Sequence, residues 1–296
     1  MLHQELTLGV DIGGSHITAA LVDMDGRTVI DNSWQRSRIQ SDGSAEEVIA
    51  GWSAVIRECL LTRPNSGRIR IAMPGPFDYE CGISRMLGQG KYDALYNVNV
   101  KAALLAKLGE LVTDIQFAND ATCFLQGESV GGAGRGYNHV LGLTLGTGFG
   151  SATFKDGRAT DADLWRHPFI DGICEDYFST RWFVRRYFEL TGNQVKDVKE
   201  LISDGRDKNR VTQVFEEFSR NLSLFITEVQ KAEEPYDCIV LGGNISNAYS
   251  HFLPRLLDFL RQKLIYAPVL VSVLGENAAL LGAAFYSEEH NVVKVD

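Results

Sequence analysis

The sequence has few cysteines, and they are not arranged as metal ligands or as a disulfide framework. Five cysteines occur in 296 residues, at positions 59, 81, 123, 174 and 238, and none belongs to a CxxC pair. An odd number of scattered cysteines is typical of reduced thiols in a cytoplasmic protein. The sequence therefore predicts a cytoplasmic location and argues against a cysteine zinc site.

Positive charge and long hydrophobic runs are also scarce. The 29 Lys and Arg residues are outnumbered by 38 Asp and Glu residues, which gives a formal net charge of -9. An acidic surface disfavours non-specific binding to nucleic acid and to anionic membranes. No apolar stretch is long enough to span a bilayer, and no basic region followed by an apolar run marks a signal peptide. We expect small-molecule ligands and neither a nucleic-acid nor a membrane partner.

Hydrophobic residues make up 45% of the chain, enough for two domains of ordinary size. In the first half we predict strands at 6–11, 17–23, 27–36, 68–72 and 115–118, and helices near 45–62 and 98–111. In the second half we predict strands at 138–145, 148–154, 237–241 and 269–273, and helices near 173–191, 209–233, 247–265 and 276–289. This alternation indicates two α/β domains, 1–117 and 118–275, with a cleft between them. We expect the C-terminal helix, about 276–296, to pack back on the first domain.

A glycine-rich turn follows the first predicted strand, in the segment Asp11-Ile-Gly-Gly-Ser15. Gly13 and Gly14 allow a tight turn whose N–H groups stay open to an anion, and Ser15 adds a hydroxyl donor. The Asp11 carboxylate is suited to hold a magnesium ion, directly or through water. An ordinary hairpin turn would explain the same residues if they stood alone.

Two further glycine turns follow strands in the second half. One contains Gly146, Thr147 and Gly148, and has more glycine than a hairpin needs, which predicts that a ligand approaches the backbone closely. A β-bulge is the alternative. The other contains Gly242 and Gly243 after an apolar strand, at the kind of strand end where α/β sheets bind ligands. It lacks the GxGxxG spacing of a dinucleotide fold and fits an adenine or a ribose instead.

Asn119 and Asp120 stand where a short strand changes into a helical pattern. A carboxylate at a domain cleft can accept the proton of an acceptor hydroxyl, so Asp120 is the candidate general base. Helix capping would also explain both residues, because Asn and Asp are favoured N-caps. One base together with glycine turns at strand ends indicates transfer of a phosphoryl group to a hydroxyl. A rigid turn containing Gly75 and the polar segment Lys91–Asn97 are further candidates for ligand contact.

Together these segments resemble the ROK family of sugar kinases, within the larger group of actin-like and hexokinase-like ATPases. The segments at 11–15 and 146–150 are similar to the family's two phosphate motifs. Those at 74–76 and 119–121 are similar to its PGP turn and catalytic segment, and 241–243 is similar to its adenosine motif. The resemblance spans nearly the whole chain. It implies a two-domain actin-like ATPase (ribonuclease H-like) fold with the active site in the interdomain cleft.

The family's sugar site and zinc loop are altered in this sequence. Its Gly-Glu-Ile-Gly-His segment corresponds here to Ala162–His167, with Asp163 in place of the sugar-binding Glu and His167 displaced by one residue. Of the zinc cysteines only Cys174 is present, so we expect no structural zinc. Glu175 opens a segment similar to the family's Glu-x-x-x-Ser helix start. Whether Asp163, His167 or Lys91–Asp93 contacts sugar is left open by the sequence.

The resemblance implies an ATP-dependent kinase of a hexose such as glucose, or of an N-acetylhexosamine such as N-acetylmannosamine, acting at O6. Asp120 would be the base, and sugar would contact Gly75, Asn119, Asp120, Asp163 and Glu175. The phosphates of Mg-ATP would lie on the turns at 13–15 and 146–148, adenosine near Gly242 and Gly243, and Mg²⁺ near Asp11. A homodimer is the family's usual state. A non-catalytic sugar or nucleotide sensor of the same fold and an acyl kinase are alternatives, although an acyl kinase needs no base such as Asp120.

Overall fold

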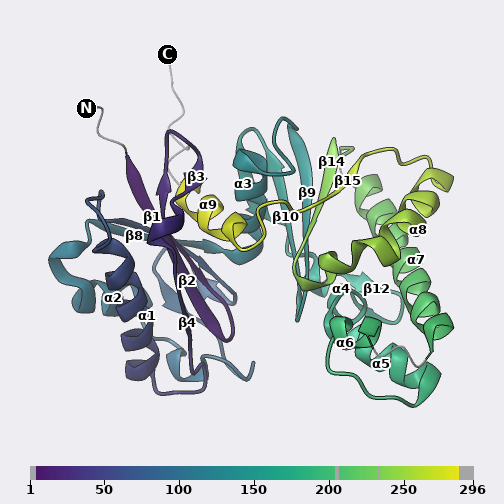
Figure 1. The fold of residues 1–296 in the computed structure, drawn as a ribbon, viewed down its shortest axis with the longest axis horizontal. Coiled ribbons are helices and arrows are strands. Elements are labelled where there is room, and N and C mark those ends of the chain that lie inside the picture. Colours follow the sequence, from purple (N-terminus) through teal and green to yellow (C-terminus); the bar gives the residue numbers. More distant parts are fainter. Residues whose placement is uncertain (1–4, 204–206, 233, 287–296) are drawn as a thin grey trace. The chain divides into compact units, whose positions relative to one another are not determined.

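The computed structural model describes residues 5–203, 207–232 and 234–286 (Figure 1). The chain forms two compact units. The first comprises the residues up to Gly132 together with those from Glu276 onward, and the second comprises Ala133–Gly275. The helix after Asn119 therefore belongs to the first unit, whereas the domain boundary expected from the sequence lies between residues 117 and 118.

The first unit is built on a mixed sheet with strand order β3-β2-β1-β5-β8, in which β4 also pairs with β2. Its strands are β1 (Leu6–Ile12), β2 (His16–Asp23), β3 (Thr28–Val29), β4 (Gln35–Arg38), β5 (Arg68–Met73) and β8 (Asp114–Asn119); a separate hairpin contains β6 (Phe77–Asp78) and β7 (Ile83–Ser84). Its α-helices are α1 (Ala45–Leu60), α2 (Val100–Leu108), α3 (Asp120–Gly131) and α9 (Asn277–Phe285). The central strands are apolar on both faces because helices cover both faces.

Helices α1 and α2 cover one face of this sheet. Helix α1 begins at a capping box, in which Ser44 accepts from the Glu47 N–H and the Glu47 carboxylate accepts from the Ser44 N–H. Its buried residues Val48, Ile49 and Trp52 share a core with side chains of β1 and β5. The hydrophobic spacing that predicted the helix thus also explains which side of it is buried.

Helices α3 and α9 lie on the other face, and glycines allow them to approach closely. A Cβ atom at Gly127 of α3 would stand 2.0 Å from the carbonyl oxygen of Ala278, and one at Gly282 of α9 would stand 1.6 Å from that of Cys123. A Cβ atom at Gly9 of β1 would stand 2.3 Å from the carbonyl oxygen of Leu280. Helix α9 is therefore seated directly on backbone, where no larger residue fits.

The second unit contains a five-stranded sheet with the order β11-β10-β9-β14-β15. The strands are β9 (His139–Leu145), β10 (Phe149–Lys155), β11 (Arg158–Asp161), β14 (Cys238–Gly242) and β15 (Val269–Val271), and a small hairpin contains β12 (Pro168–Phe169) and β13 (Gly172–Ile173). The α-helices are α4 (Cys174–Phe178), α5 (Thr180–Thr191), α6 (Val198–Ser203), α7 (Lys208–Ala232) and α8 (Tyr249–Gln262). Aromatic rings of Phe149, Phe178 and Phe225 fill the core between sheet and helices.

Most predicted elements are present, with differences where the backbone changes direction inside a predicted run. The strand predicted at 27–36 is divided by a 3₁₀ turn, Asp31–Ser33, into β3 and β4. The helix predicted at 173–191 is interrupted by extended backbone at Ser179, and the one predicted at 247–265 starts with a 3₁₀ turn, Asn244–Ala248, before α8. Residue 233 and residues 287–296 of the predicted C-terminal segment lie outside the described residues.

Candidate active site

The carboxyl ends of β1, β5 and β8 lie along one edge of the first sheet. These strands are parallel, and their register pairs Asp11 with Ala72 and Met73 with Asn119. The first glycine turn, the Gly75 turn and the start of α3 consequently follow neighbouring strands at the same edge. Ligands of α/β sheets bind at such edges, so the parallel pairing collects the predicted groups of this unit into one site.

Asp120 is the first residue of α3, and Asn119 is the N-cap of that helix. The Asn119 Oδ1 atom accepts a hydrogen bond from the Thr122 N–H (3.1 Å), and the Asp120 Oδ1 atom accepts one from the Ala121 N–H (2.8 Å). Burial raises the pKa of Asp120 above its ordinary value of 3.8, while the Ala121 N–H and the charge of Lys91 oppose the rise. The capping interpretation is therefore correct for Asn119, whereas Asp120 is the first helical residue and a carboxyl group of raised pKa.

Asp11 lies at the end of β1 in an environment rich in negative charge. Burial, followed by the nearby charges of Asp120 and Glu276, raises the pKa of Asp11 to about 7, and Arg36 acts in the opposite direction. Arg36 is itself held by both carboxylate oxygens of Glu276 at 2.5 Å. The Asp11 carboxyl thus lacks a cation of its own within the described chain, although its oxygens are of the type that Mg²⁺ prefers.

The turn that contains Gly75 is linked to the start of α3 by Tyr79. The Tyr79 hydroxyl donates to the carbonyl oxygen of Met73 (3.1 Å) and accepts from the Asn119 side-chain amide (3.3 Å). A Cβ atom at Gly75 would lie 3.3 Å from the same hydroxyl, and the Gly75–Pro76 peptide bond is cis. The structure therefore brings Gly75 and Asn119 together, through a tyrosine that no sequence motif marks.

The first glycine turn is closed by a hydrogen bond of 2.9 Å from the Gly13 N–H to the carbonyl oxygen of His16. Ser15 Oγ lies 2.8 Å from the Nδ1 atom of His16. A Cβ atom at Gly14 would meet the Lys91 side chain, whose Cδ atom would be 3.4 Å away. The stem of Lys91 therefore lies over the turn that we expect to hold phosphate.

The second glycine turn, in the other unit, is fixed by contacts to α5 and to the third glycine turn. The Gly146 carbonyl oxygen accepts bonds from the N–H (2.7 Å) and the hydroxyl (3.0 Å) of Thr180. Strand β14 pairs with β9 in parallel, so that Gly242 lies beside Thr144. A Cβ atom at Gly243, where φ is +81°, would stand 2.4 Å from the Leu145 carbonyl oxygen. Both glycine turns of this unit are thus neighbours at one sheet edge.

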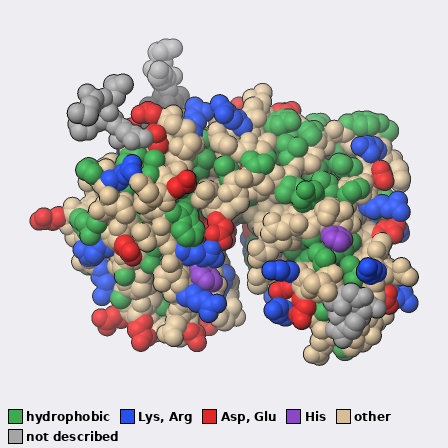
Figure 2. All heavy atoms as spheres, in the orientation of Figure 1, with side chains coloured by type: hydrophobic (Ala, Val, Ile, Leu, Met, Phe, Trp, Pro, Cys, Tyr) green, Lys and Arg blue, Asp and Glu red, His purple; other side chains and the backbone are tan. Residues whose placement is uncertain are grey.

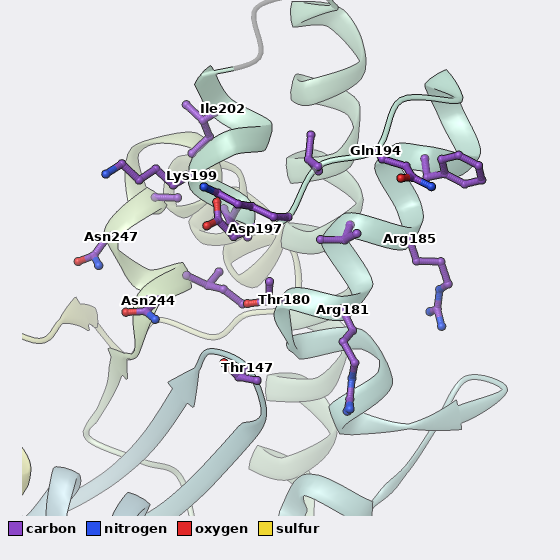
Figure 3. A pocket seen from close by; sticks show the side chains of 17 residues that line it. Thr147, Thr180, Arg181, Arg185, Gln194, Asp197, Lys199, Ile202, Asn244 and Asn247 are labelled. Carbon is purple, nitrogen blue, oxygen red and sulfur yellow. The ribbon is translucent and has the colours of Figure 1, made fainter. Parts of the chain in front are cut away.

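A cavity of about 1050 Å³ opens at these turns (Figure 3). Thr147, Thr180 and Asn244 belong to its lining and are labelled in Figure 3. Positive charge gathers in the lining, which also contains Arg181, Arg185, Lys196 and Lys199 against the single carboxylate of Asp197. A cavity of this size accommodates a nucleotide, and its charge favours a phosphate-bearing ligand. The lining residues on α5 and α6 carry no sequence motif that could have predicted them.

Glu175 lies against the second glycine turn. Its Oε2 atom accepts a bond of 3.4 Å from the Phe149 N–H and would be 3.0 Å from a Cβ atom at Gly148. Its Oε1 atom binds Arg181 at 2.5 Å. The structure therefore places Glu175 between the turn and the cavity lining, where its charge is shared with an arginine.

Asp163 and His167 each contact a charged side chain of the second unit. Asp163 is a left-handed residue (φ +49°) whose carboxylate binds Arg166, with its Oδ2 atom 3.1 Å from Nε. His167 Nε2 lies 3.1 Å from a carboxylate oxygen of Glu228 on α7. Both residues flank a 3₁₀ turn, Leu164–Arg166, in the second unit. Their present contacts are structural, and both carboxylate and imidazole remain partly exposed.

The described residues contain no group of three or more His, Cys, Asp and Glu side chains arranged to hold a metal ion. No helix in the part of the chain described here is long and apolar enough to cross a membrane. On the face shown in Figure 2, acidic and basic side chains are interspersed.

Known proteins resemble this chain over most of its length. A sequence model of the ROK family matches residues 7–161. A glucokinase of Thermotoga maritima is 25% identical, over 95% of this chain and 97% of the relative. An N-acetyl-D-glucosamine kinase of Aliivibrio fischeri is 27% identical, over 74% of this chain and 80% of the relative.

Solved structures share the fold. A ROK family glucokinase from Streptomyces griseus, in complex with glucose and AMPPNP, has a TM-score of 0.75 at 22% identity and covers 94% of this chain and 98% of its own. A ROK hexokinase from Thermus thermophilus has a TM-score of 0.75 at 22% identity, with 95% and 97% covered. These similarities confirm the predicted α/β, actin-like ATPase fold.

Proposed function

Because the chain belongs to the ROK family, we propose that it is an ATP-dependent sugar kinase. It transfers the γ-phosphoryl group of ATP to a hydroxyl group, O6, of a hexose or an N-acetylhexosamine. The observation that carries the proposal is the position of Asp120, a carboxyl of raised pKa that begins a helix at the sheet edge shared with the first glycine turn. Relatives named as glucokinases and N-acetyl-D-glucosamine kinases support this class of acceptor.

In the proposed reaction, Asp120 accepts the proton of the sugar hydroxyl. The hydroxyl oxygen forms a bond to the γ-phosphorus, and the bond from that phosphorus to the β,γ-bridging oxygen breaks, which releases ADP. The Asp120 carboxylate must be ionised before it can accept the proton, and its raised pKa makes it a stronger base than an exposed aspartate. An acceptor that is already a carboxylate would not use such a base, which favours a sugar over an acyl acceptor.

The chain offers sites for both ends of ATP. The Gly13 and Gly146 N–H groups close their own turns, so the N–H groups of residues 14–15 and 147–148 are the ones proposed to bind phosphate oxygens. Adenosine occupies the cavity beside Asn244, which directly follows Gly242 and Gly243. The cations of its lining favour the phosphate chain.

Asp11 fits the magnesium ion that accompanies ATP. Its carboxyl is partly buried beside two further carboxyl groups, and its pKa of about 7 shows that the site disfavours another unneutralised negative charge. Asp11 would hold the ion, and the bound ion would supply charge neutralisation to the phosphates.

The sugar is proposed to contact Gly75, Asn119, Asp163 and Glu175. Support for the first two comes from their direct link through Tyr79 beside Asp120. Glu175 is less free to bind sugar, because Arg181 and the Phe149 N–H occupy its oxygens. A homodimer in the cytoplasm, with no zinc, completes the proposal, and sedimentation and metal analysis of the purified protein test these last points.

A coupled assay of ADP release tests the function. Purified protein is given Mg-ATP and, one at a time, glucose, mannose, fructose, N-acetylglucosamine, N-acetylgalactosamine and N-acetylmannosamine. Sugar-dependent ADP release that Asp120→Asn abolishes supports the kinase and identifies its acceptor. A protein that binds ATP but releases no ADP with any sugar would favour the sensor.

A further inference from the structure

Lys91 is held over the first glycine turn by the residue that follows it. The Tyr92 hydroxyl donates a bond of 2.6 Å to the Gly13 carbonyl oxygen, and the Tyr92 N–H donates one of 2.6 Å to the Ser41 carbonyl oxygen. The Tyr92 ring is fully buried and packs edge-on against Trp52, with ring centroids 5.2 Å apart. Since Tyr92 is fixed at both ends, the backbone of Lys91 is fixed beside the turn.

From that position the Lys91 side chain extends over the first glycine turn. Its Cδ atom would be in van der Waals contact, at 3.4 Å, with a Cβ atom placed on Gly14. Its positive charge lowers the pKa of Asp120. The ammonium group therefore belongs to the same neighbourhood as the phosphate turn and the base, although 28 residues separate Lys91 from Asn119 in the sequence.

No ion pair within the described residues neutralises the positive charge of Lys91. No hydrogen bond or ion pair joins its ammonium group to another residue within the described ranges. Arg36, whose charge lowers the pKa of Asp11, is by contrast bound to both oxygens of Glu276. A partly buried lysine near the Asp120 carboxyl and without an ion pair is suited to an anionic ligand.

We propose that Lys91 is a catalytic residue whose ammonium group contacts the phosphoryl group as it moves from ATP to the sugar. This inference rests on the proposed kinase function and assigns a group to its chemical step. Negative charge spreads over the equatorial oxygens during the transfer, and a fixed cation stabilises it without reorganisation. Lys91 exchanges no proton and forms no covalent bond, so the reaction balances as described above.

Steady-state kinetics of Lys91→Met, Lys91→Arg and Lys107→Met test the proposal. Lys107 is a partly exposed lysine on α2 of the same unit, only 4.0 Å from Glu46, and serves as the matched control. We expect Lys91→Met to lower kcat about 10²–10³-fold, the usual loss for one such charge-stabilising donor, with the sugar KM changed less than about threefold. The kcat of Lys91→Arg should be at least about tenfold higher than that of Lys91→Met. The kcat of Lys107→Met should match that of the wild type.

Binding measurements separate this contact from a contact to the rest of the nucleotide. Calorimetric titration with Mg-AMPPNP and Mg-ADP, with and without the accepted sugar, should show that Lys91→Met weakens AMPPNP about tenfold or more and leaves ADP unchanged. Unfolding temperatures of all variants check that they fold, and Lys91→Arg remains informative if Lys91→Met does not fold.

Three results would overturn the proposal. One is a wild-type kcat in Lys91→Met. Another is an increase in the sugar KM alone, which would make Lys91 a sugar contact. The third is equal weakening of AMPPNP and ADP. Should the wild type phosphorylate none of the sugars, the kinase function fails on its own, and the comparison of AMPPNP with ADP still decides whether Lys91 contacts the γ-phosphate.

Discussion

The hydroxyl of Tyr92 donates a hydrogen bond of 2.6 Å to the carbonyl oxygen of Gly13, which joins segments 79 residues apart. Tyr92 is in the left-handed region, with φ of +58°, and its ring is fully buried. A non-glycine residue adopts this backbone only when its surroundings hold it there. The first glycine turn is thus positioned by a residue outside its own hairpin.

Tyr92→Phe keeps the buried ring and removes only this bond. We expect the free energy of unfolding to fall by about 0.5–1.5 kcal/mol and the KM for ATP to rise about 3–10-fold, because the turn loses its support. Kinetics and chemical denaturation measure the two effects. The control is Tyr266→Phe, since Tyr266 is 73% exposed. An unchanged KM would show that the bond does not shape the phosphate site.

Asp120→Asn should lower kcat by at least about 10³-fold, because an amide cannot accept the sugar proton. Sugar binding should stay within about threefold, as measured by calorimetry, since the amide keeps a polar side chain of the same shape. Asp42→Asn changes an exposed carboxylate of the same unit and should be neutral. A kcat of Asp120→Asn above a tenth of the wild-type value would show that Asp120 is not the general base.

The pH profile of kcat/KM should show the raised pKa of Asp120. The base acts only when ionised, so activity is lost as the pH falls through its folded-state pKa, which burial places above 3.8. We therefore expect an acid limb with a midpoint above the ordinary 3.8, measured with a coupling system shown not to limit the rate. A midpoint at or below 3.8 would contradict the environment described for Asp120.

Asp11 should make folding stability depend on pH in the direction opposite to that of a salt-bridged carboxylate. Its folded-state pKa of about 7 exceeds the ordinary 3.8, so its contribution is fully present below pH 4 and is lost as the pH rises to about 7. Asp11→Asn should therefore stabilise the metal-free protein at pH 8 by about 1–3 kcal/mol and not at pH 4. Urea unfolding in a chelator at both pH values measures the difference, and equal effects would refute it.

Gly127→Ala should be among the most destabilising small substitutions in the first unit. The new methyl would stand 2.0 Å from the Ala278 carbonyl oxygen, so α3 and α9 must separate, at a cost of about 3 kcal/mol or more. Gly51→Ala in α1 is the matched control. Its methyl would meet only Ile39 Cδ1 at 3.4 Å, and alanine's better helix propensity should stabilise the protein by about 0.5–1 kcal/mol. Similar unfolding midpoints for the two variants would exclude close packing of α3 on α9.

Local pattern was enough to predict the groups at strand ends. Asp11 and Asn119 both follow apolar runs that must be buried strands, and parallel pairing then aligns their ends at one edge. From the sequence Lys91 is only a candidate for sugar contact and Tyr79 is not predicted at all, because their positions depend on contacts made across many intervening residues. The cavity lining on α5 and α6 could not be predicted for the same reason. It arises from packing around the second glycine turn, and its residues share no regular spacing in the sequence.

Helix α9 also determines the order in which the protein can be completed during synthesis. Its residues 277–285 are made after the whole second unit, yet they pack against β1 and α3 of the first. On the ribosome, the apolar face of β1 and α3 that α9 covers stays exposed while residues 133–275 emerge and fold. The first unit is therefore the last to mature, and a chain interrupted before α9 would present that face to chaperones and proteases.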